Sequence, residues 1–328
     1  MALALVAAVL VSLTLGRYPL GLGDLAYFFG HLAAGGEAAD PSRWETLYNV
    51  LINIRLPRIL AAVLIGSSLS VSGAAYQAMF VNPLVSPGLL GVLAGASFGA
   101  ALGIVFAQTW LAVQALAFAC GLLAVLAALA LASMYRGERI LMLILGGVIS
   151  GALFTSLLAV IKYLADPYDQ LPAIVYWLMG GLSMADGHTV WTMGGPMLGG
   201  VLLLMLLGNY LNVLSMGDEE ARSLGVNVSR LRLLLIFLAT LVSALTVAMG
   251  GMIGWVGLVI PHIARMLVGP DNRVLLPAAT LVGGTYLLIV DDLARLMFST
   301  EVPLGILTSL VGIPFFALVL RKAKKGWQ

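Results

Sequence analysis

Charged residues are scarce in this chain of 328 residues. Asp, Glu, Lys and Arg together make up only 10% of it, whereas 61% of the residues are hydrophobic, and the mean hydropathy is +1.05. A soluble globular protein carries about 25% charged and about 45–50% apolar residues. The chain lacks the charge that would cover a soluble fold, so its composition predicts a protein surrounded by lipid.

Cysteine, histidine and nucleotide-binding signatures are also nearly missing. The single cysteine, Cys120, excludes an intramolecular disulfide, and its apolar surroundings predict a small buried side chain. The three histidines, His31, His188 and His262, lack the spacing of metal ligands, so we expect no metal site and no cofactor. No Gly-x-x-x-x-Gly-Lys-Ser/Thr loop occurs, and a net charge of +2 indicates no nucleic-acid partner.

Long, continuous apolar runs are what the sequence does have. Membrane β-barrels show alternating segments of about ten residues, whereas a spanning helix needs about 20 apolar residues in a row. We therefore expect an all-α integral membrane protein, a single domain over residues 1–328 with about ten transmembrane helices. The expected spans are 1–16, 58–80, 89–107, 111–134, 139–162, 190–211, 232–252, 255–267, 275–297 and 304–320.

Glycine and proline mark the special spans. The eighth run is short and contains Gly254, Gly257 and Pro261, which predicts a broken helix beside protein or a water-filled cavity. Glycines also recur at every fourth residue of the third run, which predicts close helix packing. These are Gly91, Gly95, Gly99 and Gly103.

Lysines and arginines predict the orientation, because cytoplasmic loops carry an excess of them. With the N-terminus inside, eleven of the 17 lie at inside segments: Arg136, Arg139, Arg222, Arg230, Arg232, Arg265, Arg273, Arg321, Lys322, Lys324 and Lys325. The other six lie outside: Arg17, Arg43, Arg55, Arg58, Lys162 and Arg295. We expect both termini in the cytoplasm.

An inverted internal repeat is also predicted. Arg55-Leu-Pro-Arg58 precedes the second run, and Arg230-Leu-Arg232 precedes the seventh. Each is followed by four runs, and the two enter the membrane from opposite sides, as in many transporters.

The inside connection at about 212–231 contains a short charged helix. Asp218 or Ser215 can cap its N-terminus, Glu219 and Glu220 suit its first turn, and Gly225 suits its end. Two interpretations stay open here, an ordinary capped loop helix and a docking knob for a soluble partner.

Several segments carry a family resemblance. Glu219-Glu-Ala-Arg-Ser-Leu-Gly-Val-Asn227 resembles the coupling loop of FecCD-type ABC-importer permeases, which take up vitamin B12, ferric siderophores and haem. Further matches occur in the same order along the chain: Arg55-Leu-Pro-Arg58, Gly73-Ala-Ala-Tyr-Gln77, Asn82-Pro-Leu-Val-Ser-Pro-Gly-Leu-Leu-Gly91, Gly254-Trp-Val-Gly-Leu-Val-Ile-Pro-His-Ile-Ala-Arg265, Asp291-Asp-Leu-Ala-Arg295 and Glu301-Val-Pro-Leu-Gly-Ile306.

The resemblance implies a type II ABC-importer permease fold and an alternating-access mechanism. In such importers two permease chains form the pore in the bacterial inner membrane, and a periplasmic binding protein delivers the cargo. Two separate ATPase subunits hydrolyse ATP, so the permease itself is not an enzyme. The implied cargo is a chelated metal or a corrinoid, meaning a ferric siderophore, haem or vitamin B12, with oxyanions such as molybdate also found among relatives.

The resemblance also implies site residues. Contact with the ATPase falls to Asp218, Glu219, Glu220, Ala221, Arg222, Leu224 and Gly225. Docking of the binding protein falls to Arg55, Arg58 and Arg295, because a guanidinium binds a carboxylate bidentately. Interfacial snorkelling is the alternative for Arg55 and Arg58. For Arg295 it is a local ion pair with Asp291 or Asp292, four and three residues away on one helix.

Gate and pathway residues follow in the same way. The resemblance places Asn82 and Leu84 at the inner constriction and Ile140 and Leu141 at the other gate segment. We expect spans five, eight and ten and the 172–182 segment to line the pathway, with Tyr163, Tyr176, Trp177 and Met179 as contacts. An aromatic belt at the membrane interface is the alternative for such residues.

A different transporter class remains an alternative. An ion- or proton-coupled secondary transporter would show a similar repeat. It should carry an ionisable residue at mid-membrane, and spans two, three, four, seven and ten have none in their interiors.

Overall fold

A computed structural model of the chain describes residues 1–34, 40–134 and 138–323, and in these ranges it contains helices and no strand. Arg136, Lys324 and Lys325, which contribute to the predicted charge bias, lie outside the described residues. The helices are α1 (Ala2–Thr14), α2 (Leu22–Ala34), α3 (Pro41–Tyr48), η1 (Asn49–Arg55), α4 (Leu56–Met79), η2 (Pro87–Leu90), α5 (Val92–Leu102), η3 (Gly103–Ala107), α6 (Trp110–Met134), α7 (Arg139–Leu164), α8 (Gln170–Leu178), α9 (Gly187–Leu206), α10 (Gly208–Leu214), α11 (Asp218–Ser223), α12 (Val228–Gly250), α13 (Val256–Val268), α14 (Asn272–Leu296) and α15 (Leu304–Ala323).

The ten expected spans are confirmed as helices. Six are long and apolar enough to cross a membrane: α4 with its extension, α6, α7, α9, α12 and α14. The other four are the shorter apolar helices α1, α5 with η3, α13 and α15. The chain is therefore an all-helical, multi-span membrane protein.

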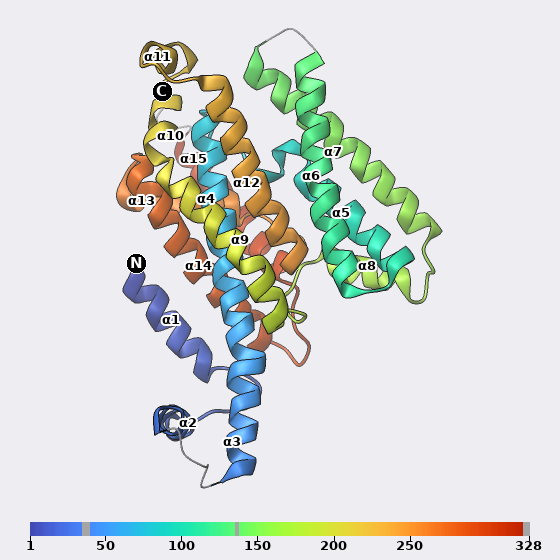
Figure 1. Ribbon diagram of the computed structural model, residues 1–328, viewed down its shortest axis with the longest axis vertical. Coiled ribbons are helices and arrows are strands. Elements are labelled where there is room, and N and C mark those ends of the chain that lie inside the picture. Colours follow the sequence, from blue (N-terminus) through green and yellow to red (C-terminus); the bar gives the residue numbers. More distant parts are fainter. Residues whose placement is uncertain (35–39, 135–137, 324–328) are drawn as a thin grey trace.

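Helix α4 forms the centre of the bundle. Figure 1 shows it running along the long axis between α9, α12, α13 and α14, while α5 to α8 form a group to one side. Its packing is close because small residues face its neighbours. A Cβ atom on Gly66 would lie 2.2 Å from the Gly283 carbonyl oxygen of α14, and one on Gly73 would lie 1.9 Å from that of Gly257 in α13.

The glycine stripe of the third span has the predicted role. A Cβ atom on Gly95 would lie 2.3 Å from the Cys120 carbonyl oxygen, and one on Gly99 would lie 2.0 Å from that of Leu116. Both carbonyls belong to α6, so α5 and α6 approach backbone to backbone.

The irregular backbone at the eighth span lies at its start. Helix α13 is continuous through Pro261, and the irregular backbone is the preceding 251–255 segment, where Trp255 has φ +67°. Proline cannot bond the carbonyl four residues earlier. That carbonyl, of Gly257, is the one that faces Gly73 of α4.

The connection between α1 and α4 is helical over much of its length and contains α2, α3 and η1. Helix α3 continues through the π-helix η1 into α4, so one helical element runs over Pro41–Met79. Asp40 caps this element by accepting a hydrogen bond from the Arg43 N–H at 3.1 Å, and Pro41 occupies its first turn. Phe28 of α2 stacks on Trp44 with ring centres 4.9 Å apart.

The two ends of the bundle differ. Figure 1 shows α11 at one end, and α2 and α3 projecting from the other. Helices α4 and α12 run in opposite directions, and each precedes a short helix that follows an irregular segment. This arrangement agrees with an inverted repeat.

Candidate functional site: the two ends of the bundle and the cavities between them

Helix α11 is fixed to the bundle by a buried arginine. Arg232 of α12, whose side chain is 2% exposed, donates from Nη2 and Nη1 to the two Asp218 carboxylate oxygens at 2.6 and 3.1 Å. The residue at the N-cap is Gly217, with φ +117°, so the expected cap by Asp218 or Ser215 is wrong. Asp218 pairs with Arg232 instead, and Ser215 bonds the Asn212 carbonyl. Ala221, also in α11, is fully buried.

The opposite face of α11 is open. Glu219, Glu220 and Arg222 are exposed, and Leu224 is 61% exposed at the helix end. Gly225 follows with φ +79°, as its predicted role requires. The element is thus a short knob, with the acidic Glu219 and Glu220 exposed on its side and the apolar Leu224 exposed at its tip. Of the seven predicted coupling residues, Asp218 and Ala221 anchor this knob while the others form its surface and end.

A group of hydrogen bonds that joins α10 to the start of α14, here called the polar clasp, was not predicted from the sequence. The Asn212 amide donates to Asp271 at 2.6 Å and accepts from the Asn272 backbone and side chain at 2.8 and 2.9 Å. The hydrogen bond from Asn212, followed by that from the Arg273 N–H, lowers the pKa of Asp271 below its ordinary value. Asp-Asn before a helical run is a helix-start signal that could have located one half of the clasp.

The predicted gate residues lie on two separate segments. Asn82 accepts a hydrogen bond from the Leu84 N–H at 2.9 Å, which fixes the turn after α4, and the Leu84 side chain is exposed. Ile140, at the start of α7, packs against the core cluster around α4, whereas Leu141 is exposed. Their gating role stays a prediction.

The predicted docking arginines lie in a buried ion network at the other end. Arg58 binds both Asp291 and Glu301, and Arg295 contacts Asp291 at 3.3 Å and also Asp292. Ser12 of α1 donates to Asp292 at 2.7 Å. Arg55 donates to the backbone carbonyls of Leu13 and Tyr18.

All three arginines are at most 9% exposed, so they are not the open surface that docking suggests. For Arg295 the local ion pair is confirmed, and snorkelling is wrong for Arg58. A cavity of about 240 Å³ nevertheless reaches this network from outside, lined by Arg17, Arg55, Arg58, Arg295 and Glu301 among others. Docking through this cavity stays a prediction.

A cavity of about 490 Å³ lies where the pathway is expected. It is lined by Leu93, Leu178, Met179, Met252, Gly254, Gly305, Ile306, Ser309 and Leu310. These come from the end of α8, the segment before α13, and α15. Predicted span ten and the 172–182 segment therefore line this cavity, whereas predicted span eight (255–267) contributes none of these residues. The fifth span, α7, contributes none of this lining, and α5 contributes Leu93 instead.

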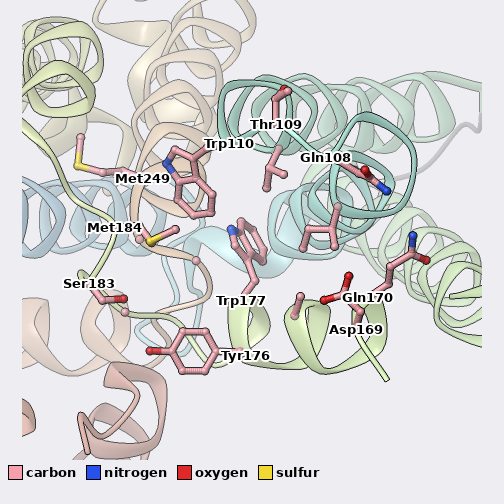
Figure 2. A pocket seen from close by; sticks show the side chains of 16 residues that line it. Gln108, Thr109, Trp110, Asp169, Gln170, Tyr176, Trp177, Ser183, Met184 and Met249 are labelled. Carbon is pink, nitrogen blue, oxygen red and sulfur yellow. The ribbon is translucent and has the colours of Figure 1, made fainter. Parts of the chain in front are cut away.

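A second cavity, of about 590 Å³, lies on the other side of α8 (Figure 2). Trp110 of α6 and Trp177 of α8 point into it beside Met184 and Met249, and Tyr176 lies at its edge. The predicted contacts therefore separate: Met179 faces the 490 Å³ cavity, and Tyr176 and Trp177 face the larger one. Tyr163, 88% exposed at the end of α7, belongs to neither lining.

Comparison with known proteins gives one consistent family. Residues 4–322 match the sequence model of the FecCD transport family. The chain is 39% identical to the molybdate import system permease protein MolB of Haemophilus influenzae, over 99% of this chain and 95% of that protein. It is 37% identical to the hemin transport system permease protein HmuU of Yersinia pestis, over 96% and 94%. A solved structure of a metal-chelate type ABC transporter in an inward-facing conformation shares 38% identity and a TM-score of 0.86, over 98% and 97% of the two chains.

Proposed function

This chain belongs to the FecCD transport family and is an ABC-importer permease, and from that premise we propose that its cargo is a chelated metal or a corrinoid. The observation that carries the proposal is the wall of the 490 Å³ cavity. Its described lining residues are aliphatic side chains, thioethers, glycines and one serine, and none of these is charged. A metal inside an organic chelator can pass through a cavity with such a lining. A bare oxyanion would lose its hydration there and find too few hydrogen-bond donors to replace the water.

We place this subunit in a larger assembly. Two copies enclose the pathway, with the exposed apolar side chains of α15 (Ile306, Leu310, Val311, Ile313 and Leu318) facing the second copy. The α11 end faces the cytoplasm and two ATPase subunits, and the α2–α3 end faces a periplasmic substrate-binding protein. The membrane is then the inner membrane, and both termini are cytoplasmic.

Transport by alternating access follows from these contacts. The chain's own contribution is the path and the knob, while ATP binding and hydrolysis belong to the partner subunits. Movement of the ATPases shifts α11, and the buried Arg232–Asp218 pair transmits that shift to α12. Because α12 packs on α4, the shift reaches the centre of the bundle.

Uptake by the reconstituted complex tests the cargo. The permease, its ATPase and its binding protein are placed in proteoliposomes and given radiolabelled ferric siderophore, haem, cobalamin or molybdate. We expect ATP-dependent uptake of one of the first three. Molybdate is the second candidate, because MolB is a similar relative. Uptake of molybdate alone would overturn the proposed cargo.

A further inference from the structure

Arg58 has two carboxylate-binding edges, and both are occupied within this chain. Its Nε and Nη2 donate to Asp291 at 2.9 and 3.0 Å. Its Nη1 and Nη2 donate to Glu301 at 2.9 and 3.0 Å. A guanidinium carries five N–H donors in one planar fork, so a third carboxylate can bind bidentately only by replacing one of these two.

The two carboxylates are held very differently. Asp291 lies within α14, its side chain is 1% exposed, and it also contacts Arg295 at 3.3 Å. Its loss would leave two buried guanidinium groups without their shared counter-charge. Glu301 belongs to the segment between α14 and α15, and its side chain is 30% exposed. Glu301 is therefore the replaceable ligand of Arg58.

The surroundings of Glu301 are arranged for an incoming acidic group. Glu301 and Arg58 line the 240 Å³ cavity together with Arg17, Arg55 and Arg295, so four cations and one carboxylate face the same space. Arg55 is 3% exposed and is held there by two backbone carbonyls. Asp291 and Asp292 pair with Arg58 and Arg295 beside the cavity, so four arginines face three carboxylates and a net positive charge of one remains. This positive charge attracts a carboxylate from outside.

We propose that Glu301 occupies, before docking, the edge of Arg58 that an acidic side chain of the docking partner binds. On docking, the partner's carboxylate replaces Glu301 on Arg58. This inference rests on the proposed function, which assigns a substrate-binding protein to this end. The exchange preserves charge, because one carboxylate leaves Arg58 as another arrives, and the released Glu301 is free to become hydrated.

The exchange also reaches the pathway. Three residues after Glu301, the Leu304 N–H donates to the Gly180 carbonyl at 3.0 Å, and the Gly305 N–H donates to that of Met179 at 3.0 Å. Met179 and Gly305 line the 490 Å³ cavity. Release of Glu301 frees the segment that holds this joint between α8 and α15. A partner can shift a conformational equilibrium only through a contact that differs between the two states, and the carboxylate exchange is such a contact.

Affinity for the binding protein tests the exchange. The complex is held in lipid nanodiscs, and the substrate-binding protein of its own transport system is titrated against it by biolayer interferometry. Glu301→Gln weakens the internal competitor, so we expect binding about five- to tenfold tighter. The matched control is Glu45→Gln on the exposed face of α3, which makes the same chemical change at the same end and should stay within about twofold. Unchanged or weaker binding by Glu301→Gln, or an equal gain in the control, would overturn the inference.

Arg58→Lys separates the inference from the docking assignment. Lysine keeps the charge beside Asp291 but cannot bind two carboxylates in a fork. We expect at least tenfold weaker docking, and no gain when Glu301→Gln is added, with thermal unfolding confirming that the variants are folded. Docking unaffected by Arg58→Lys would refute the assignment of Arg58 itself. If Arg58→Lys weakens docking but Glu301→Gln leaves the affinity unchanged, the exchange is refuted and the assignment of Arg58 stands.

A thiol probe tests the link to α15 without any partner. The only native cysteine, Cys120, is buried, so a cysteine placed at Ile306 in the cavity wall reports access there. We expect a soluble maleimide to label Ile306→Cys several-fold faster when Glu301 is Gln than when it is Glu. Equal labelling rates would refute the link between Glu301 and the pathway.

Discussion

At the scale of single residues, one ion pair fixes α11 to the bundle: the buried Arg232 guanidinium of α12 binds the Asp218 carboxylate. The coupling motif correctly marks a short helix and its end at Gly225. It does not divide the motif into anchors and surface, because that division depends on Arg232, which lies 14 residues after Asp218 in the chain and folds back onto it. The docking arginines show the same limit. For Arg58, the carboxylate partners Asp291 and Glu301 lie 233 and 243 residues away in sequence.

Loss of the Asp218 carboxylate should therefore loosen the whole knob. Asp218→Ala leaves the buried Arg232 guanidinium without its counter-charge, and we expect it to destabilise the protein by about 2–3 kcal/mol, since Asp218 is itself partly solvated. Arg222 makes only an exposed contact to Asp218 at 3.7 Å, so Arg222→Ala should cost about 0.2–0.5 kcal/mol.

Thermal unfolding in detergent measures the two effects, and hydrogen exchange of the α11 amides locates them. Faster exchange in Asp218→Ala but not in Arg222→Ala is the expected pattern. Equal effects of the two substitutions would mean that Arg232 does not hold the helix.

At the scale of helices, apolar runs and glycine spacing predict most of the fold. Ten runs become ten helices because a spanning segment must satisfy its backbone internally. Helices α2 and α3 were missed for different reasons. The sequence of α3 is polar, and α2 is apolar but has only 13 residues, fewer than the about 20 apolar residues that mark a span. Asp40-Pro41 was nevertheless a helix-start signal. The sequence predicted a broken helix near α13 but not where it breaks. Pro261 leaves the helix intact, and the Gly257 carbonyl, which Pro261 cannot bond, contacts α4.

That contact makes Gly73 a sensitive position. An alanine methyl group there would lie 1.9 Å from the Gly257 carbonyl oxygen, so α4 and α13 must separate. We expect Gly73→Ala to destabilise the protein by about 1–3 kcal/mol or more, and uptake to fall with the loss of packing. Gly195, in α9, is exposed and has no atom within 4 Å of its added methyl group. Gly195→Ala should change stability by less than about 1 kcal/mol.

The midpoints of thermal unfolding of both variants, measured in one detergent, check this difference. A Gly73→Ala protein as stable as the Gly195→Ala protein would show that α4 and α13 adapt to the methyl group without cost.

At the scale of the whole molecule, the two ends carry opposite kinds of contact. The α11 end offers an acidic, exposed knob, whereas the α2–α3 end holds its arginines in a buried network beneath an arginine-lined cavity. Composition predicts such a bundle. It does not predict which charged side chains are exposed and which form buried ion pairs, because the partners in those pairs are far apart in sequence. A permease that couples two partners needs both ends to respond, and α4 joins them, since Arg58 lies near its outer start and α12 packs along its length.

Reversal of charge on the knob should separate ATP hydrolysis from transport. Glu219 and Glu220 are exposed on α11, outside the Asp218–Arg232 anchor, so Glu219→Lys with Glu220→Lys leaves the fold intact while it repels a cationic contact on the ATPase. We expect uptake in proteoliposomes to fall at least about tenfold, equivalent to ~1.4 kcal/mol of lost coupling, while the ATPase subunits keep hydrolysing ATP. Glu45→Lys on exposed α3, at the other end of the molecule, should leave this coupling ratio unchanged. Full transport by the double variant would place the ATPase contact elsewhere than α11, and loss of thermal stability would instead assign the two glutamates to the anchor.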